Sequence, residues 1–264
     1  LYGDVPLITP ATLKKMVARR KDRLTLLTAK FPNPTGYGRI IRDSIGAVVG
    51  IVEEKDANDN QRKVQEGNTG LMYLPTKLLA KWLSQITNKN AQREYYLTDI
   101  IALARRDGCR VTSVQPSSAS EVEGVNNRQQ LAALERAYQR QLAEQLMASG
   151  TTLADPARFD QRGTLSVGTD NFIDVNCVFE GQVHLGEGAR IGPNCVIANA
   201  DIAAGAVVHA FTHIDGEKLG VTVGEGSLIG PFARLRPGAD LAAEVHIGNF
   251  VEVKNSTMAK GAKA

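Results

Sequence analysis

The sequence predicts two folded parts of different class: an α/β domain comes first, a parallel β-helix follows, and one long helix joins them. Two observations favour this organisation. Aliphatic residues recur every six positions through the C-terminal half, whereas residues 1–127 alternate between strand-like and helix-like segments. A chain of 264 residues is long enough for two domains, each with its own core.

The six-residue repeat is the strongest pattern in the chain. The fifth place of a unit is compact, as at Cys177, Cys195, Ser227 and Val245, and the insertion DGEKLGVT interrupts the repeat at 215–222. The residues that open the units are Val167, Ile173, Phe179, Leu185, Ile191, Ile197, Ile202, Val208, Ile214, Val223, Ile229, Leu235, Leu241, Ile247 and Val253. This pattern is typical of a parallel β-helix, in which three short strands form a coil of about 18 residues and the openers point inward. Families with this hexad are left-handed, so we expect a left-handed coil although parallel crossovers are usually right-handed.

The segment before the repeat predicts an amphipathic connecting helix. In RQQLAALERAYQRQLAEQLMA (128–148), apolar residues fall at helical spacing, and Ser149-Gly150 ends the helix. The apolar positions are Leu131, Leu134, Tyr138, Leu142 and Leu146. We therefore divide the chain into a first domain (1–127), a linker helix (128–150) and a repeat domain (151–264).

The first domain alternates between two kinds of segment. Strand-like runs lie at 24–29, 47–52 and 110–116, and helical stretches lie at 9–20, 76–86 and 97–106. This alternation predicts an α/β domain.

Composition excludes several classes of protein. Lys and Arg number 31 against 28 Asp and Glu, which gives no basic footprint for nucleic acid. No apolar run approaches the about 20 residues of a membrane span, and we expect no signal peptide. Three cysteines without a CxxC pair favour a reducing compartment, so we expect a cytoplasmic protein in which Cys177 and Cys195 are small interior residues. The chain starts at Leu1 and stops at Ala264 with the repeat still running, and we expect an internal piece of a longer protein.

Asp4 is the first candidate site residue. LYGDVPLI ends an apolar segment in Gly3-Asp4, and ligands of open α/β sheets bind outside the carboxyl ends of strands. A carboxylate at that place can hold Mg²⁺, which takes one or two protein oxygens and fills its other positions with phosphate and water. The alternative is a turn or N-cap aspartate ahead of the helix near residue 10.

Five further segments offer polar or flexible positions with ordinary alternatives. Gly38 in NPTGYGRI lets the backbone approach a ligand, and Asn68 in GNTGLM offers an amide donor and acceptor, although both also suit simple turns. Glu53 in IVEEKD belongs by default to a solvated charge run. Thr98 in EYYLTD suits a helix start, and Asn126 in EGVNNR suits an N-cap.

The repeat domain carries two cations at a place that is otherwise small. Arg236 and Lys254 both follow an opener and are 18 residues apart, which is one coil, so they are expected on the same wall about 4.8 Å apart. Stacked like charges repel, whereas a bound phosphate would turn the pair into a binding site. The alternative is two exposed cations near acids such as Glu252.

Taken together, these segments resemble the bacterial bifunctional family of N-acetylglucosamine-1-phosphate uridyltransferase / glucosamine-1-phosphate N-acetyltransferase. The resemblance covers nearly the whole chain and is carried by LYGDVPLI, PTGYGRI, IVEEKDA, NTG, EYYLTDIIALA, EVEGVNNR, DPARFDQRGT, GPFARLRPGA and IGNFVEVK. It implies a Rossmann-like uridyltransferase domain, a helical arm, and a left-handed β-helix that forms a homotrimer.

The resemblance also implies site residues and ligands. Asp4 and Asn126 correspond to the family's Mg²⁺ ligands. The positions that line its pocket for UTP or UDP-N-acetylglucosamine are Tyr2, Gly3, Asp4, Gly38, Glu53, Asn68 and Asn126, and those on the sugar-phosphate side are Tyr96 and Thr98. Arg236 and Lys254 correspond to residues that bind glucosamine-1-phosphate in the acetyltransferase site.

The implied reactions are acetyl transfer from acetyl-CoA to glucosamine-1-phosphate, and then uridylyl transfer from UTP to N-acetylglucosamine-1-phosphate. The second reaction needs positioning and charge neutralisation rather than a general base. The family's G-x-G-T-x-M phosphate loop is absent, and its catalytic histidine would lie past Ala264. We therefore assign no catalytic residue, expect this chain to be inactive alone, and place His184, His209, His213 and His246 on the surface or in loops.

Two other functions stay open. The chain would also suit another sugar-nucleotide pyrophosphorylase whose β-helix binds or regulates without acetylating. It would equally suit a non-enzymatic module in which the β-helix only assembles trimers.

Overall fold

The computed structural model describes residues 3–18 and 23–264, and the chain divides into two compact units, Leu1–Leu134 and Glu135–Ala264. The division falls within helix α5 (Arg128–Ala148). The bounds of α5 confirm the helix that the sequence predicts at 128–148. Each unit has a hydrophobic core of its own. No helix in the described ranges is both long and apolar enough to cross a bilayer.

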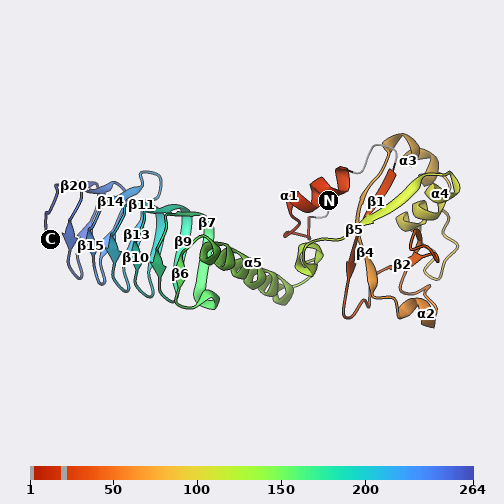
Figure 1. Cartoon of the computed structure of the whole chain (residues 1–264), viewed down its shortest axis with the longest axis horizontal. Coiled ribbons are helices and arrows are strands. Elements are labelled where there is room, and N and C mark those ends of the chain that lie inside the picture. Colours follow the sequence, from red (N-terminus) through yellow and green to blue (C-terminus); the bar gives the residue numbers. More distant parts are fainter. Residues whose placement is uncertain (1–2, 19–22) are drawn as a thin grey trace. The chain divides into compact units, whose positions relative to one another are not determined.

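The first unit is built on a mixed sheet whose strands have the order β3-β2-β4-β1-β5. These strands are β1 (Arg23–Lys30), β2 (Arg39–Arg42), β3 (Val48–Val52), β4 (Glu66–Tyr73) and β5 (Arg110–Val114). Figure 1 labels β1, β2, β4 and β5 of this sheet. β1 pairs parallel with β5 and antiparallel with β4, while β2 pairs antiparallel with β3 and β4. The predicted strands are confirmed as β1, β3 and β5. The sequence analysis missed β2, which is short, and β4, whose EGNTGLMY is too rich in glycine and polar residues to suggest a strand.

Helices pack against both faces of this sheet, which confirms the α/β class. α1 (Pro10–Val17) contributes Met16 to a core on one face, and α3 (Thr76–Leu83) contributes Trp82 to a core on the other, where α4 (Ile100–Arg106) also packs. Side chains alternate along β1, so Leu24 and Leu26 enter one core while Leu27 enters the other. Short helical turns are α2 (Asp59–Arg62), η1 (Leu97–Asp99) and η2 (Ala119–Val122).

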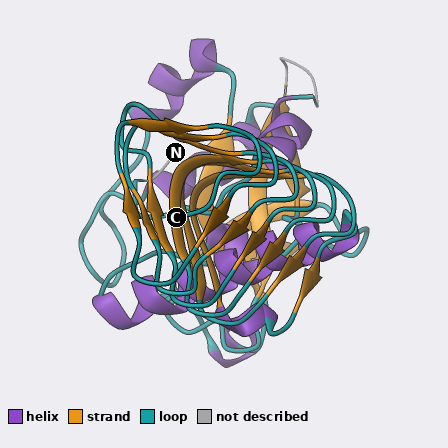
Figure 2. Cartoon of the chain, turned by 90° about the vertical axis from the view of Figure 1, so that its left-hand side faces the viewer, coloured by secondary structure: helices purple, strands orange, loops and turns teal. Residues whose placement is uncertain are grey.

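The second unit is a parallel β-helix with three walls. One wall contains β6 (Thr152–Leu153), β8 (Phe172–Ile173), β10 (Arg190–Ile191), β12 (Val207–Val208), β15 (Leu228–Ile229) and β18 (His246–Ile247). The long strands that bend across the next two walls are β7 (Phe159–Val167), β9 (Cys177–Leu185) and β11 (Val196–Ile202). These two walls continue as β13 (His213–Asp215), β16 (Arg234–Leu235) and β19 (Glu252–Val253), and as β14 (Val221–Val223), β17 (Ala239–Leu241) and β20 (Ser256–Met258). Figure 2 shows the coils from their C-terminal end, with successive strands lying over one another.

The burial of the openers confirms the six-residue period. Each opener from Ile173 to Ile247 is no more than 1% exposed, Val253 is 8% exposed, and Val167 in the first coil is partly exposed. The fifth-place residues Cys177 and Cys195 are also buried, and burial raises the pKa of their thiols to about 12 and about 11. A hydrophobic interior explains why the sequence keeps these two places apolar or small.

One corner of the β-helix carries residues in the left-handed backbone region. It is occupied by Asn176 and Asn194 in the early coils and then by Phe211, Phe232 and Phe250, all with φ between 56° and 61°. The rings of the three phenylalanines stack with centroids 5.1 and 5.4 Å apart and are exposed to solvent. Asparagine tolerates this conformation whereas phenylalanine seldom adopts it, so stacking offsets part of the strain.

The C-terminal part of helix α5 lies against β7, and the buried face of the helix differs from the predicted one. Leu134, Leu146 and Ala143 are buried as apolar residues, but Leu131 and Tyr138 are exposed, so the predicted stripe is wrong at these two places. Gln139 is buried instead. Its side chain donates to Gln161 O at 2.8 Å and accepts from Gln161 N at 2.8 Å, which satisfies the open edge of β7.

Candidate functional site

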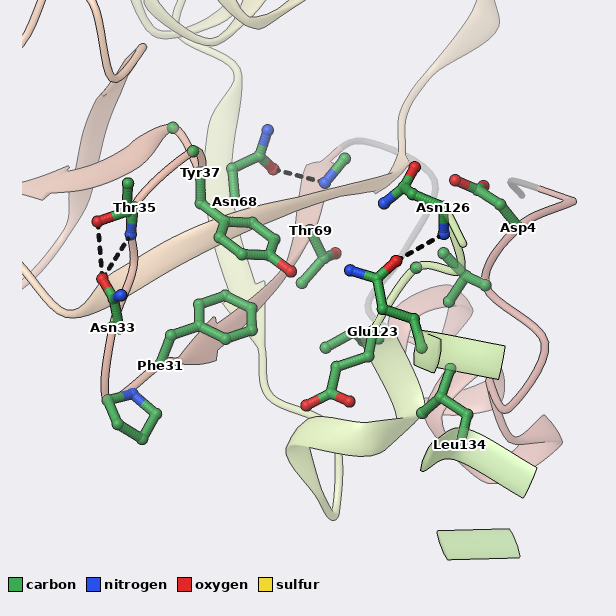
Figure 3. Close-up of a pocket in the computed structure, with 18 of the residues that line it drawn as sticks. Asp4, Phe31, Asn33, Thr35, Tyr37, Asn68, Thr69, Glu123, Asn126 and Leu134 are labelled. Carbon is green, nitrogen blue, oxygen red and sulfur yellow. Dashed lines mark hydrogen bonds between the residues drawn. The ribbon is translucent and has the colours of Figure 1, made fainter. Parts of the chain in front are cut away.

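A cavity of about 800 Å³ opens in the first unit (Figure 3). Five segments that are far apart in sequence line it: residues 4–5, 31–38, 53, 68–70 and 122–134. The predicted residues Asp4, Gly38, Glu53, Asn68 and Asn126 all lie on its wall. The fold therefore gathers in one place five residues that the sequence had shown only separately.

Asp4 and Asn126 lie beside one another at one end of the cavity (Figure 3). Val125 N donates to Asp4 O at 2.8 Å, and a Cβ atom placed on Gly124 would be 3.4 Å from Asp4 Oδ2. The main chain of Asn126 is held by its own hydrogen bond, because its N–H donates to Gln130 Oε1 at 2.7 Å. Two tethers thus position this corner of the site.

The donor set at this corner fits Mg²⁺. Within the described ranges, neither the Asp4 carboxylate nor the Asn126 side-chain amide takes part in a hydrogen bond or ion pair. Those ranges also contain no cluster of three or more His, Cys, Asp or Glu residues that could hold a metal. An uncommitted carboxylate and an uncommitted amide oxygen are suited to Mg²⁺, which usually keeps several waters and is bound by one or two protein groups plus substrate phosphates.

Gly38, Asn68 and Glu53 also line the cavity, whereas Thr98 is not on its wall and reaches the site only through Glu53. Asn68 N donates to Gly38 O at 2.8 Å, and Thr98 Oγ1 donates to Glu53 Oε1 at 2.8 Å. A Cβ atom on Gly38 would lie 2.8 Å from Ile51 Cγ2 and 3.2 Å from Glu53 Oε2, so only glycine fits there. Asn68 Oδ1 accepts from Gly70 N at 3.1 Å, which leaves its NH₂ group to donate into the cavity.

The other predicted residues of the first unit are less closely engaged. Tyr96 does not line the cavity, and its hydroxyl accepts from Gln92 Nε2 at 2.9 Å. Gly3 is exposed and also absent from the wall. Tyr2 lies outside the described residues.

The sequence analysis missed an aromatic wall of the cavity. Phe31 and Tyr37 stack with centroids 4.1 Å apart and ring planes inclined by 15°. Burial, and then the negative charge of Glu123, raise the pKa of the Tyr37 hydroxyl. Two aromatic residues on either side of the NPTG turn were the available signal.

An ion pair between a buried arginine and a partly exposed glutamate holds the turn that carries Gly38. Arg39 is 2% exposed, and its Nη2 contacts Glu54 Oε2 at 2.6 Å, while its Nη1 donates to Tyr37 O. The same Glu54 oxygen accepts from Gly36 N at 3.3 Å. The Arg39 hydrogen bond keeps the pKa of the Glu54 carboxyl below its usual value. Part of the charge run IVEEKD is therefore fixed in place rather than simply solvated.

Arg236 and Lys254 occupy equivalent places in adjacent coils, as expected. Arg234 pairs with Glu252 and Leu235 with Val253 in the β16–β19 register, and Arg236 N donates to Val253 O at 2.9 Å. Glu252 accepts from Arg236 Nη1 at 3.1 Å and from Arg234 Nη1 at 3.3 Å. Lys254 is exposed. Both the phosphate-binding interpretation and the alternative with Glu252 are compatible with this arrangement.

Comparisons with known proteins agree with the two-part organisation. Residues 165–199 match the family model described as bacterial transferase hexapeptide (six repeats). Proteins called Bifunctional protein GlmU match the whole chain: that of Polaromonas sp. is 62% identical, that of Acidovorax ebreus 59%, and that of Pseudomonas putida 54%. The chain spans about 57% of the length of each of these relatives. Among solved structures, the chain is similar to a mutant of AntD, an N-acyltransferase from Bacillus cereus in complex with dTDP and coenzyme A. The sequence identity is 14% and the TM-score is 0.38, over 44% of this chain and 80% of that chain. This similarity is too low to support a conclusion.

The fold and the site together define an α/β unit with a polar-lined cavity, followed by coils that in part match a hexapeptide-repeat family. Along its whole length the chain is similar to the proteins called Bifunctional protein GlmU.

Proposed function

We propose that the chain is the middle part of a bifunctional enzyme that makes UDP-N-acetylglucosamine for peptidoglycan synthesis. One half would transfer acetyl from acetyl-CoA to glucosamine-1-phosphate, and the other would transfer uridylyl from UTP to N-acetylglucosamine-1-phosphate. The observation that carries this proposal is the convergence of Asp4, Gly38, Glu53, Asn68 and Asn126 on one cavity. The 54–62% identity to the bifunctional relatives supports it.

The proposed domains follow the sequence boundaries. Residues 1–127 would belong to a Rossmann-like uridyltransferase domain, residues 128–150 to a linker, and residues 151–264 to a left-handed acetyltransferase β-helix. The parallel β1–β5 pair and the helices on both sheet faces support the first assignment.

In the uridyltransferase site, each side of the cavity would have its own task. Asp4 and Asn126 would supply oxygens to Mg²⁺, which when bound neutralises charge on the reacting phosphates. Asn68 would donate its free NH₂ group, and Glu53 would accept a sugar hydroxyl at Oε2, since its Oε1 is occupied by Thr98. Positioning of this kind is most of what phosphoryl transfer requires from a protein.

In the acetyltransferase site, Arg236 and Lys254 would bind the phosphate of glucosamine-1-phosphate. A bidentate guanidinium beside a point-charge ammonium suits a dianionic phosphate. The contact between Arg236 and Glu252 favours a second candidate function, a sugar-nucleotide pyrophosphorylase whose β-helix does not acetylate, because in it the arginine is already neutralised.

The proposed partners include two further copies of the chain, which would form a homotrimer in the cytoplasm through the β-helix. Exposed apolar side chains on the β-helix, among them Phe211, Phe232 and Phe250, support association because soluble monomers seldom expose grouped aromatic rings.

Replacement of Asp4 tests the metal assignment. In a protein of the relatives' full length, Asp4→Ala should lower uridyltransfer by at least about 100-fold while acetyl transfer stays unchanged, because only one of two separate sites loses a metal ligand. Both activities are measured on the same preparation. Asp59→Ala is the control, since its carboxylate is 96% exposed and lies outside the cavity wall. An equal loss of both activities in Asp4→Ala would show that Asp4 contributes to folding and would contradict its assignment as a metal ligand.

A further inference from the structure

Glu121 is a buried carboxylate that the proposed reactions do not use. It lies on η2, is 3% exposed, and accepts three hydrogen bonds. The donors are Thr12 Oγ1 at 2.7 Å, Ser117 N at 2.8 Å and Thr9 Oγ1 at 2.9 Å. A buried carboxylate is costly unless such donors surround it, so this group requires the segments that supply them to stay in place.

The three donors join two segments that are far apart in sequence. Thr9 caps α1, and its Oγ1 also accepts from Thr12 N at 3.2 Å. Thr9 lies 112 positions before Glu121. Burial alone would raise the pKa of Glu121, but the hydroxyls of Thr12 and Thr9 hold the pKa below its usual value. Through these hydrogen bonds the ionised carboxylate connects the start of α1 to the segment at 117–122, and we call this arrangement the Glu121 clasp.

The same two segments carry the oxygen pair of the proposed metal site. Asp4 precedes the start of α1, and Asn126 follows η2, with Val125 N donating to Asp4 O at 2.8 Å between them. The hydrogen bonds of Glu121 and this main-chain bond connect the segment around the start of α1 to the segment at 117–126 at two separate places. Because Asp4 and Asn126 have no side-chain partners of their own in the described residues, their separation depends on these tethers.

We propose that Glu121 is a positioning residue for the metal site, because its bonds to Thr9 and Thr12 set the distance between Asp4 and Asn126. This inference rests on the proposed role of those two residues as metal ligands. Glu121 itself does not contact the metal or the substrates.

The test measures metal affinity directly in the full-length protein, with Mn²⁺ alone as the probe and free Mn²⁺ followed by EPR. Glu121→Gln should weaken Mn²⁺ binding about 10-fold, because an amide offers one acceptor oxygen in place of two and carries no charge. The Mg²⁺ concentration for half-maximal uridyltransfer should rise similarly, while saturating Mg²⁺ restores kcat. Loss of stability alone would not produce that pattern.

A matched control comes from the same unit. Glu66 is a partly buried carboxylate that accepts from Thr28 Oγ1 at 2.7 Å and contacts Arg42 at 2.6 Å, away from the cavity wall. Glu66→Gln should leave Mn²⁺ affinity within about twofold of the wild type, since outer groups affect a metal through its ligands. An equal weakening in both variants would overturn the positioning role.

Thr12→Val keeps the inference testable if Glu121→Gln does not fold, because it removes one donor and leaves the carboxylate and the side-chain shape in place. It should weaken Mn²⁺ binding in the same direction, and an unchanged affinity in a folded Thr12→Val or Glu121→Gln protein would refute the proposal. Asp4→Ala in the same assay distinguishes a failure of the proposed metal site from a failure of the proposed positioning role of Glu121. If Asp4→Ala retains Mn²⁺ affinity, the metal site itself is misplaced; if it loses affinity while Glu121→Gln does not, only the clasp is wrong.

Discussion

At the residue scale, the outer wall of the β-helix balances its charges through Glu252. Its two carboxylate oxygens contact Arg236 and Arg234, and all three side chains are at least 30% exposed. Exposed ion pairs of this kind contribute about 0–1 kcal/mol. A phosphate that meets Arg236 and Lys254 together can therefore compete with Glu252 at small cost.

Removal of either cation should be specific to one activity. In the full-length protein, Arg236→Ala or Lys254→Ala should weaken the use of glucosamine-1-phosphate by about 10- to 1000-fold, because each removes a charged contact to a desolvated phosphate. Uridyltransfer should be nearly unchanged. The measurement is kcat/KM for each reaction at varied sugar phosphate.

Arg234→Ala is the matched control, because Arg234 shares Glu252 but lies two register positions before the place that is level with Lys254. It should change kcat/KM by less than about threefold, as expected for a rim charge. Equal losses from Arg234→Ala and Arg236→Ala would leave only a general effect of charge and contradict the proposed phosphate site.

At the element scale, the β-helix depends on glycines that lie against the backbone of the next coil. A Cβ atom on Gly224 would lie 2.3 Å from Ala242 C and 2.4 Å from Ala242 O. Gly226, two positions later, has φ +64° but faces open space. The first glycine is needed for close approach, and the second is needed only for its backbone conformation.

These two glycines should respond differently to alanine. Gly224→Ala should lower the free energy of unfolding by about 2–4 kcal/mol, because the main chain of the neighbouring coil cannot move aside. Gly226→Ala should cost about 1 kcal/mol, since left-handed strain is partly offset by a less flexible unfolded chain. Urea denaturation followed by circular dichroism measures both, and a larger effect at Gly226 would contradict this account of the coil spacing.

At the scale of the whole molecule, the chain consists of two units with separate cores, and we propose that the second unit mediates assembly. We expect the chain to sediment as a trimer at micromolar concentration, because flat parallel walls and exposed rings favour association of identical coils. Sedimentation velocity across a dilution series measures this. A monomer at every concentration would mean that this chain lacks the contacts needed for the proposed trimer.

Local patterns predicted some parts of the chain better than others. The six-residue period identified the inward positions from Ile173 to Val253, and helical spacing located α5, because both patterns depend on neighbours in sequence. The same spacing was wrong about Leu131 and Tyr138. The buried side of α5 is set by the open edge of β7, which selects Gln139 for hydrogen bonding, and no periodicity of apolar residues records that requirement.

The sequence by itself determined the repeat, the long helix, the α/β alternation of the first unit and the identity of the candidate site residues. Only the tertiary structure decided which of them meet. It placed Asp4 beside Asn126 and Glu53 beside Thr98, left Tyr96 off the cavity wall, and paired Arg236 with Glu252. It also buried the Glu121 carboxylate among three hydrogen-bond donors, which no local pattern in the sequence indicated. The physical reason is that these contacts join residues brought together by sheet pairing and coil stacking, and their energies depend on distances across the fold rather than along the chain.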